Sequence, residues 1–158
     1  MLRSLLLTAA VICFHATSPS AQDAKPNFTG NWSLDVAKSD PQAPESISHE
    51  IAHEEPNITV TTTTKAQGNV GVDEQRFTTD GKEHTNKMML MGAERQVNVT
   101  ARWRGETLLT SWRFAAHRRT MEFNDSWSLA EGGKVLIFVR VAKTPDGDFP
   151  LKMVYNKQ

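Results

Sequence analysis

Apolar and polar side chains alternate along most of this chain once the first twenty or so residues are passed. In residues 97–104 the odd positions hold Val, Val, Ala and Trp, and the even positions hold Asn, Thr and Arg. Residues 121–129 repeat the pattern, with Met121, Phe123, Trp127 and Leu129 on one side. A period of two is typical of a strand with one buried and one solvated face.

Turn residues divide these patterned stretches at near-regular intervals. Asp80-Gly81, Arg104-Gly105, Glu131-Gly132-Gly133 and Pro145-Asp146-Gly147 each separate two runs rich in Thr, Val, Ile, Phe and Trp. Together with the alternation they predict ten strands, at residues 27–36, 46–54, 58–65, 70–79, 82–91, 94–103, 106–114, 118–129, 134–143 and 149–156.

Strands of similar length joined by tight turns predict an all-β protein. We expect a single antiparallel up-and-down β-barrel of about eight to ten strands. Residues 45–55 fit either a strand or a short helix. Residues 135–141 are apolar at every position but one, so we expect the N-terminal segment or a partner to cover their outer face.

The N-terminus predicts export. Arg3 is the only charged residue before an apolar run from Leu5 to Phe14, and small or polar residues follow as far as Ala21. This run is too short for a membrane span, which needs about 20 apolar residues. The pattern is that of a secretory signal peptide over residues 1–21, cleaved after Ala21 or Ser20. We therefore expect a periplasmic or secreted protein, with one domain over residues 22–158 and no stable membrane insertion.

Composition narrows the function only by exclusion. The sole cysteine, Cys13, lies in the predicted signal peptide, so disulfides cannot stabilise the mature domain. The formal net charge of the whole chain is zero, and no basic face suggests nucleic acid or anionic membranes as partners. The chain contains no phosphate-binding loop, and we expect no cofactor. A protein partner stays open.

Several short motifs, spread over nearly the whole mature chain, carry a family resemblance. They are Asn27-Phe28-Thr29-Gly30-Asn31-Trp32-Ser33-Leu34, Ala37-Lys38-Ser39-Asp40, Thr79-Asp80-Gly81-Lys82-Glu83, Trp103-Arg104-Gly105-Glu106-Thr107-Leu108, Trp127-Ser128-Leu129 and Val154-Tyr155-Asn156-Lys157-Gln158. The chain resembles a family of exported bacterial proteins of unknown function with lipocalin-like barrels. Gly30-Asn31-Trp32 is also similar to the Gly-x-Trp of the wider calycin group, in which the tryptophan closes one barrel end.

This resemblance implies a small barrel with an apolar cavity and implies no activity. The chain departs from the related fatty-acid-binding proteins, whose final strands carry an Arg-x-Tyr carboxylate clamp. Here Met153 stands two residues before Tyr155, so that clamp cannot be transferred to this chain.

His49-Glu50-Ile51-Ala52-His53 spells H-E-x-x-H, the signature of zinc proteases with the glutamate as general base. The motif needs a helix, which brings both histidines to one metal. On a strand they lie about 13 Å apart, because each residue rises ~3.3 Å. Pro56 and Thr59 stand where the longer metzincin pattern has Gly and the third His. We favour a strand and no metal, and keep a small zinc hydrolase as an alternative.

The inward-facing aromatic residues are the candidate ligand contacts. They are Trp103, Trp112, Phe114, Phe123 and Trp127, with His49 or His53 as a polar anchor. Asp125 interrupts the apolar face between Phe123 and Trp127, where an unpaired carboxylate would be unfavourable. It marks a β-bulge or an inward carboxylate paired with an arginine, and we favour the bulge.

The sequence therefore predicts an exported lipocalin-like protein that binds a small apolar ligand in the barrel or at its mouth, without catalysis. An interaction or inhibitor module with a solid barrel is the main alternative. The size of the cavity distinguishes the two.

Overall fold

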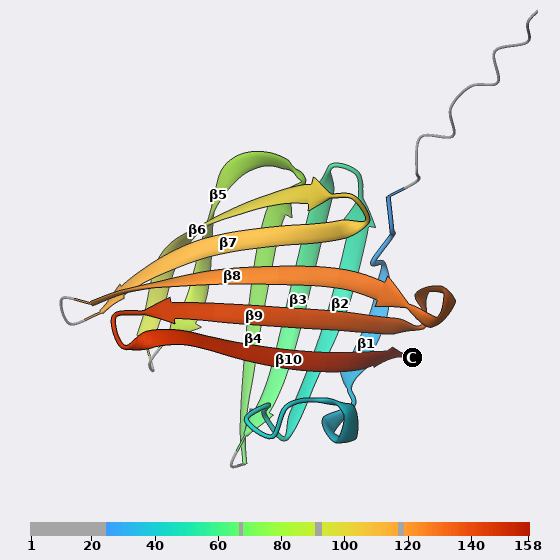
Figure 1. Ribbon diagram of the computed structural model, residues 1–158, viewed down its shortest axis with the longest axis horizontal. Helices are drawn as coiled ribbons and strands as arrows, with labels where there is room; N and C mark the ends of the chain where they lie inside the picture. The colour runs from blue at the N-terminus through green and yellow to red at the C-terminus, as the bar shows by residue number, and fades with distance from the viewer. Residues whose placement is uncertain (1–24, 67, 91–92, 117–118) are drawn as a thin grey trace, which may run out of the picture.

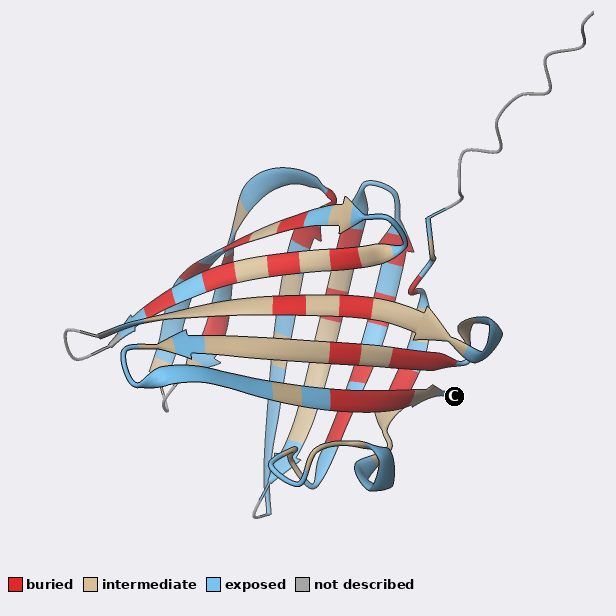
Figure 2. Ribbon diagram, viewed as in Figure 1, coloured by how far each residue is buried: buried red, intermediate tan, exposed pale blue. Residues whose placement is uncertain are grey.

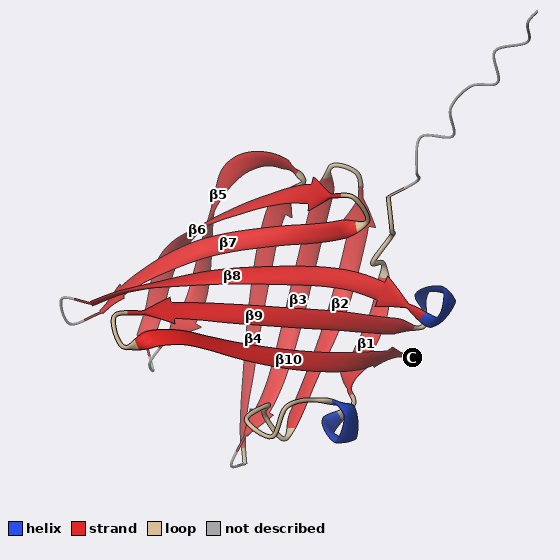
Figure 3. Ribbon diagram, in the orientation of Figure 1, coloured by secondary structure: helices blue, strands red, loops and turns tan. Residues whose placement is uncertain are grey.

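The computed structural model describes residues 25–66, 68–90, 93–116 and 119–158, so the predicted signal peptide lies outside the described residues. Strands make up most of this part of the chain, with two short 3-10 helices, η1 (Val36–Lys38) and η2 (Glu131–Gly133) (Figure 3). The strands are β1 (Gly30–Leu34), β2 (Ser46–Glu54), β3 (Asn57–Ala66), β4 (Asn69–Thr78), β5 (Asp80–Leu90), β6 (Ala93–Arg104), β7 (Thr107–Ala116), β8 (Arg119–Ala130), β9 (Val135–Thr144) and β10 (Gly147–Lys157).

The ten strands form one antiparallel meander that closes on itself. The order of hydrogen-bonded neighbours is β4-β3-β2-β1-β10-β9-β8-β7-β6-β5, so the first strand pairs with the last. In Figure 1, β6–β10 cross in front of β1–β4, and the barrel is flattened into two layers. The predicted all-β up-and-down barrel is confirmed. Residues 46–54 are strand and not helix.

A seam remains between β4 and β5, which stand at the two ends of the hydrogen-bonded order. Side chains bridge it in place of a backbone ladder. The Asn86 amide accepts from the Arg76 N–H at 2.7 Å and donates to the Arg76 carbonyl at 3.1 Å. Asp73 accepts from the Met89 N–H at 3.0 Å. An amide side chain can satisfy both backbone groups of one residue, because it carries a donor and an acceptor.

The core lies between the two layers and contains the inward positions of the strands (Figure 2). Trp32 on β1 and Tyr155 on β10 are fully buried, although both belong to the strands that close the barrel. The Trp32 indole donates to the Phe28 carbonyl at 2.9 Å, which anchors the segment before β1. Lys157 covers the outer side of that ring, with Nζ 5.1 Å from its centroid.

The described residues cover the outer face of β9 only in part. Ile137 and Val139 stay half-buried there. The loop that contains η1 lies along β10 instead, where the Asp40 N–H donates to the Lys152 carbonyl and Ser39 Oγ accepts from the Val154 N–H. The described N-terminal residues 25–29 do not cover β9; they pack against one end of the barrel.

Removal of the Trp32 side chain should destabilise the fold severely. Trp32→Ala creates a cavity at a fully buried position and leaves the Phe28 carbonyl without its donor. We expect a loss of about 3–5 kcal/mol in the free energy of unfolding, measured by urea denaturation. Val72→Ala, at a position that is 61% exposed, is the control and should change it by less than about 0.5 kcal/mol. Equal effects of the two substitutions would contradict this account of the core.

Candidate functional site

A cavity of 290 Å³ lies between the two layers of the barrel. Its walls come from β2–β5 on one side and β8–β10 on the other. Most lining side chains are apolar, among them Ile47, Val60, Trp127, Phe138 and Met153. Pro44, Thr64, Leu90 and Leu151 extend the lining toward the barrel end where β2 begins and β3 ends. Hollows on the outer surface, of 540 and 610 Å³, are lined mainly by hydroxyl, amide and charged side chains.

One charged side chain of the cavity wall is Arg140 on β9. Its guanidinium forms a two-pronged ion pair with Asp125 on β8, with Nε–Oδ1 and Nη2–Oδ2 distances both 2.8 Å. The two residues face each other in the regular β8–β9 register. Asp125 is therefore an inward carboxylate paired with an arginine, and the bulge that we favoured from the sequence is wrong.

Three aromatic rings surround the Arg140 guanidinium. Its central carbon lies 5.4 Å from the Trp112 ring centroid, 5.5 Å from that of Phe123 and 5.2 Å from that of Phe138. The Trp112 and Phe123 rings stack on each other with centroids 4.0 Å apart. Cation–π attraction strengthens where water is excluded, so these rings hold the arginine in place beside the cavity.

His49 on β2 provides a second polar group in the cavity wall. Its Nδ1 lies 3.0 Å from Thr62 Oγ1, and its ring packs 4.6 Å from the Tyr155 ring centroid. Burial, aided by the positive charge of Arg140, lowers the pKa of His49 to about 4. Burial likewise raises the pKa of the Tyr155 phenol. Both side chains are therefore uncharged near neutral pH.

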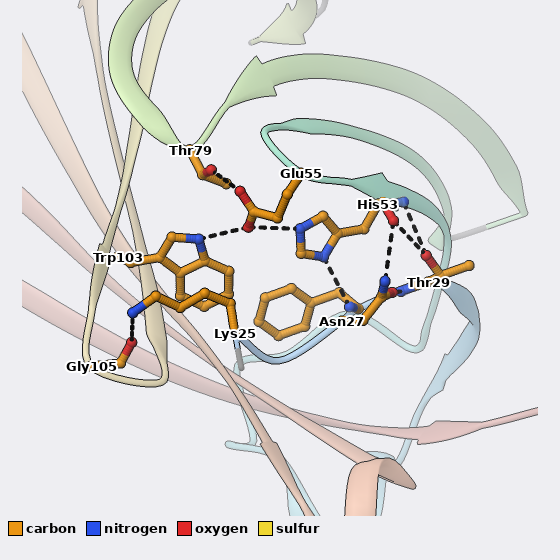
Figure 4. A network of polar contacts seen from close by, with 9 residues as sticks. Lys25, Asn27, Thr29, His53, Glu55, Thr79, Trp103 and Gly105 are labelled. Atoms are coloured by element: carbon orange, nitrogen blue, oxygen red, sulfur yellow. Dashed lines mark hydrogen bonds and ion pairs between the residues drawn. The ribbon is translucent and has the colours of Figure 1, made fainter. Parts of the chain in front are cut away.

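A separate polar network closes one barrel end (Figure 4). The Glu55 carboxylate accepts hydrogen bonds from the Trp103 indole at 2.7 Å and from the Thr79 hydroxyl. His53 Nε2 lies 3.1 Å from the same carboxylate. Burial raises the pKa of Glu55, but the bonds from Thr79, Trp103 and His53 outweigh it and hold the pKa below its usual value.

His53 ties the N-terminal segment to this network. The Phe28 N–H donates to His53 Nδ1 at 3.1 Å, so Nδ1 is an acceptor and the ring proton sits on Nε2, facing Glu55. The Phe28 ring packs against both His53 and Trp103, with centroids 5.8 Å from each, and those two rings lie 6.2 Å apart. Lys25 reaches the Gly105 carbonyl at 3.0 Å. Residues 25–29 thus close this end, and none of them lines the cavity.

The structure divides the sequence-predicted site residues among four places. His49 and Trp127 line the cavity. Trp112 and Phe123 surround Arg140, and Phe114 is in the core. Trp103 and His53 belong to the closed end.

Sequence reasoning missed Arg140, Tyr155 and Glu55. The pairing of Arg140 with Asp125 had a signal, because the two positions are equally distant from the Gly132-Gly133 turn. A hairpin that turns there places Asp125 opposite Arg140.

The H-E-x-x-H sequence does not form the geometry of a zinc protease here. His49 and His53 both point inward from β2, as alternation requires, but they belong to two different clusters. Glu50, the base in the zinc alternative, is exposed on the opposite face. Among the described residues there is no group of three or more His, Cys, Asp and Glu placed to hold a metal ion.

No helix among the described residues is long and apolar enough to cross a bilayer.

The sequence matches no protein-family model. No curated protein matches it significantly. Solved structures do share the fold. Zebrafish ileal bile acid-binding protein, in complex with cholic acid, is 16% identical with a TM-score of 0.59 over 83% of this chain and 98% of that one. The REP1-NXSQ fatty acid transporter is 14% identical with a TM-score of 0.58 over 83% and 96%. Secretory abundant heat soluble protein 4 from Ramazzottius varieornatus is 18% identical with a TM-score of 0.57 over 88% and 99%. The chain therefore shares the barrel fold of these proteins.

The buried His49 should make stability depend on pH. Its pKa in the folded protein, about 4, lies below its ordinary value of 6.5, so the unfolded chain takes up the proton first as the pH falls. Stability should therefore drop by about 3 kcal/mol between pH 6.5 and 4 through this group alone. His49→Gln should remove that part of the slope in urea unfolding measured across this range.

Carboxylates such as Glu55 also make the free energy of unfolding depend on pH in the lower half of the same range. The difference in slope between wild type and His49→Gln therefore isolates the contribution of the histidine. Thr85→Ala, at an exposed position on β5 without a titratable group, is the control and should keep the wild-type slope. An unchanged slope in His49→Gln would show that His49 is not held neutral by burial.

Proposed function

We propose that this protein binds one small apolar molecule in the cavity between its two layers. The observation that carries the proposal is the make-up of that cavity, which has apolar walls on both sides and a few fixed polar groups. Arg140, His49 and Tyr155 are among these groups, and packing or hydrogen bonds hold each of them. Ligand sites of proteins have this composition, and their volumes begin at about 300 Å³.

The cavity favours ligand binding as the function, rather than an interaction module with a solid barrel that acts only through its surface. A barrel of eight to ten strands encloses a space that side chains can just fill or that holds one small ligand. Here 290 Å³ stays open although Trp127, Phe138 and Tyr155 all line it. Two structural neighbours are named for bile acid and fatty acid binding or transport, and these names support the same class of ligand here.

We further propose that the protein acts outside the cytoplasm, in the periplasm or after secretion, as a member of the exported bacterial family that its motifs resemble. The N-terminal pattern ends at Ala21, and the segment that closes the barrel begins only four residues later, at Lys25. Cleavage after Ala21 would therefore leave the closed end of the barrel intact.

Ligand binding can be tested with N-phenyl-1-naphthylamine, an uncharged apolar dye. We expect saturable binding of one dye per chain at micromolar concentration, with quenching of tryptophan emission because Trp127 lines the cavity. Leu151→Trp places a large ring in the lining and should weaken binding by about tenfold or more. Fluorescence titration measures both effects.

The matched control is Leu109→Trp. Leu109 is half-buried like Leu151 but lines an outer hollow and not the cavity. It should leave the dye affinity within about threefold of wild type. Absence of saturable binding, or equal loss in the two variants, would refute the proposed site.

Export can be tested by N-terminal sequencing of protein recovered from the periplasm or medium of a bacterial host. The expected first residue is Gln22, or Ala21 if cleavage follows Ser20. Protein that begins at Met1, or that carries a lipid on Cys13, would contradict export as a free protein.

A further inference from the structure

We propose that the ligand of this cavity is electrically neutral and carries a hydrogen-bond acceptor, such as an ester, ketone or hydroxyl oxygen, which Arg140 binds. The inference rests on the proposed function and adds the chemical class of the ligand. It excludes carboxylates, the group that an arginine in an apolar cavity would otherwise attract.

The positive charge of Arg140 is already balanced inside the protein. Asp125 accepts two hydrogen bonds from it at 2.8 Å, the arrangement of the strongest arginine–carboxylate pairs. Only 3% of the Asp125 side chain is exposed, so little water competes for this carboxylate. A second carboxylate would have to displace Asp125 or remain without a charge partner.

Arg140 nevertheless has hydrogen bonds left to donate. Asp125 uses two of the five N–H groups of a guanidinium. The other three make no hydrogen bond to the described residues, while 27% of the side chain is accessible and it lines the cavity. Donors without partners beside an open cavity suit an acceptor on the ligand, and a neutral oxygen meets this need without adding charge.

The remaining titratable groups of the cavity wall do not compensate a ligand anion. His49, with a pKa of about 4, and Tyr155, with a raised pKa, are both uncharged near neutral pH. Asp73, half-buried at the seam, adds a negative charge to the lining. A bound carboxylate would therefore face Arg140 together with two aspartates, and a buried charge without a partner is strongly unfavourable.

The test compares methyl decanoate with decanoate, which share one alkyl chain and differ in charge. Each is titrated near neutral pH by displacement of N-phenyl-1-naphthylamine from the purified protein. The ester should bind tighter than the anion by about tenfold or more. Decanoate that binds as well as the ester, or better, would overturn the inference while the proposed function stands. Failure of the dye itself to bind would instead count against the proposed function.

Asp125→Asn provides the decisive variant, because it leaves the Arg140 charge unbalanced at nearly constant volume. Decanoate should gain about tenfold in affinity and the ester should change by less than about threefold. Asp125→Glu keeps the charge and should keep the preference for the ester. An unchanged preference in Asp125→Asn would refute the charge argument.

Circular dichroism establishes whether Asp125→Asn is folded. If it is not, Asp73→Asn provides the same test from the opposite wall, because it removes a negative charge without touching the Arg140–Asp125 pair. In Asp73→Asn the ratio of the affinity for the ester to the affinity for decanoate should fall by about threefold or more. A preference equal to that of the wild type in this variant would also speak against the inference.

Discussion

The pairing of β1 with β10 turns a ten-stranded meander into an enclosed space. It rests on three register pairs, from Trp32 opposite Lys157 to Leu34 opposite Tyr155. Both ends of the barrel depend on it. Tyr155 lines the cavity, and the Trp32 indole fixes the backbone of Phe28, whose ring closes the opposite end. Because so short a ladder carries this closure, the backbone beyond it contributes as well, and the Asp35 N–H continues the pairing to the Val154 carbonyl at 2.7 Å.

Burying the Arg140–Asp125 pair in this interior costs free energy, because both charges lose their hydration. Two apolar side chains of similar size often stabilise a protein as well as a buried ion pair or better, since neither charge must leave water. Stability alone therefore does not account for a pair placed in the wall of a cavity. The position of the ion pair accounts for its presence better. Asp125 binds two of the guanidinium N–H groups, and the others remain on a side chain that lines the cavity. The pair supplies directed donors without net charge.

Much of the fold could be predicted from the sequence, because alternation and glycine turns act locally. All ten strands fall within a few residues of their predicted bounds. The site was harder to predict from the sequence, because it depends on the register between neighbouring strands. Asp125 stood out as a break in an apolar face, yet its partner lies fifteen residues away across a hairpin whose loop length sets the pairing. Glu55 gave no signal, because Trp103 on β6 and Thr79 in the turn between β4 and β5 are distant from it in the sequence.

The two histidines of the H-E-x-x-H sequence show that one short motif has different geometry on a helix and on a strand. A strand sends both inward but separates them by about 13 Å, because each residue rises ~3.3 Å. That distance carries His53 to the closed end, where it binds the Phe28 N–H and Glu55, and leaves His49 beside Tyr155 in the cavity wall. The cavity extends toward the opposite barrel end, past Thr64 and Leu90. The cavity wall around His49 and the network around His53 therefore occupy different parts of one strand, and under the proposed function a bound ligand would leave the His53 network intact.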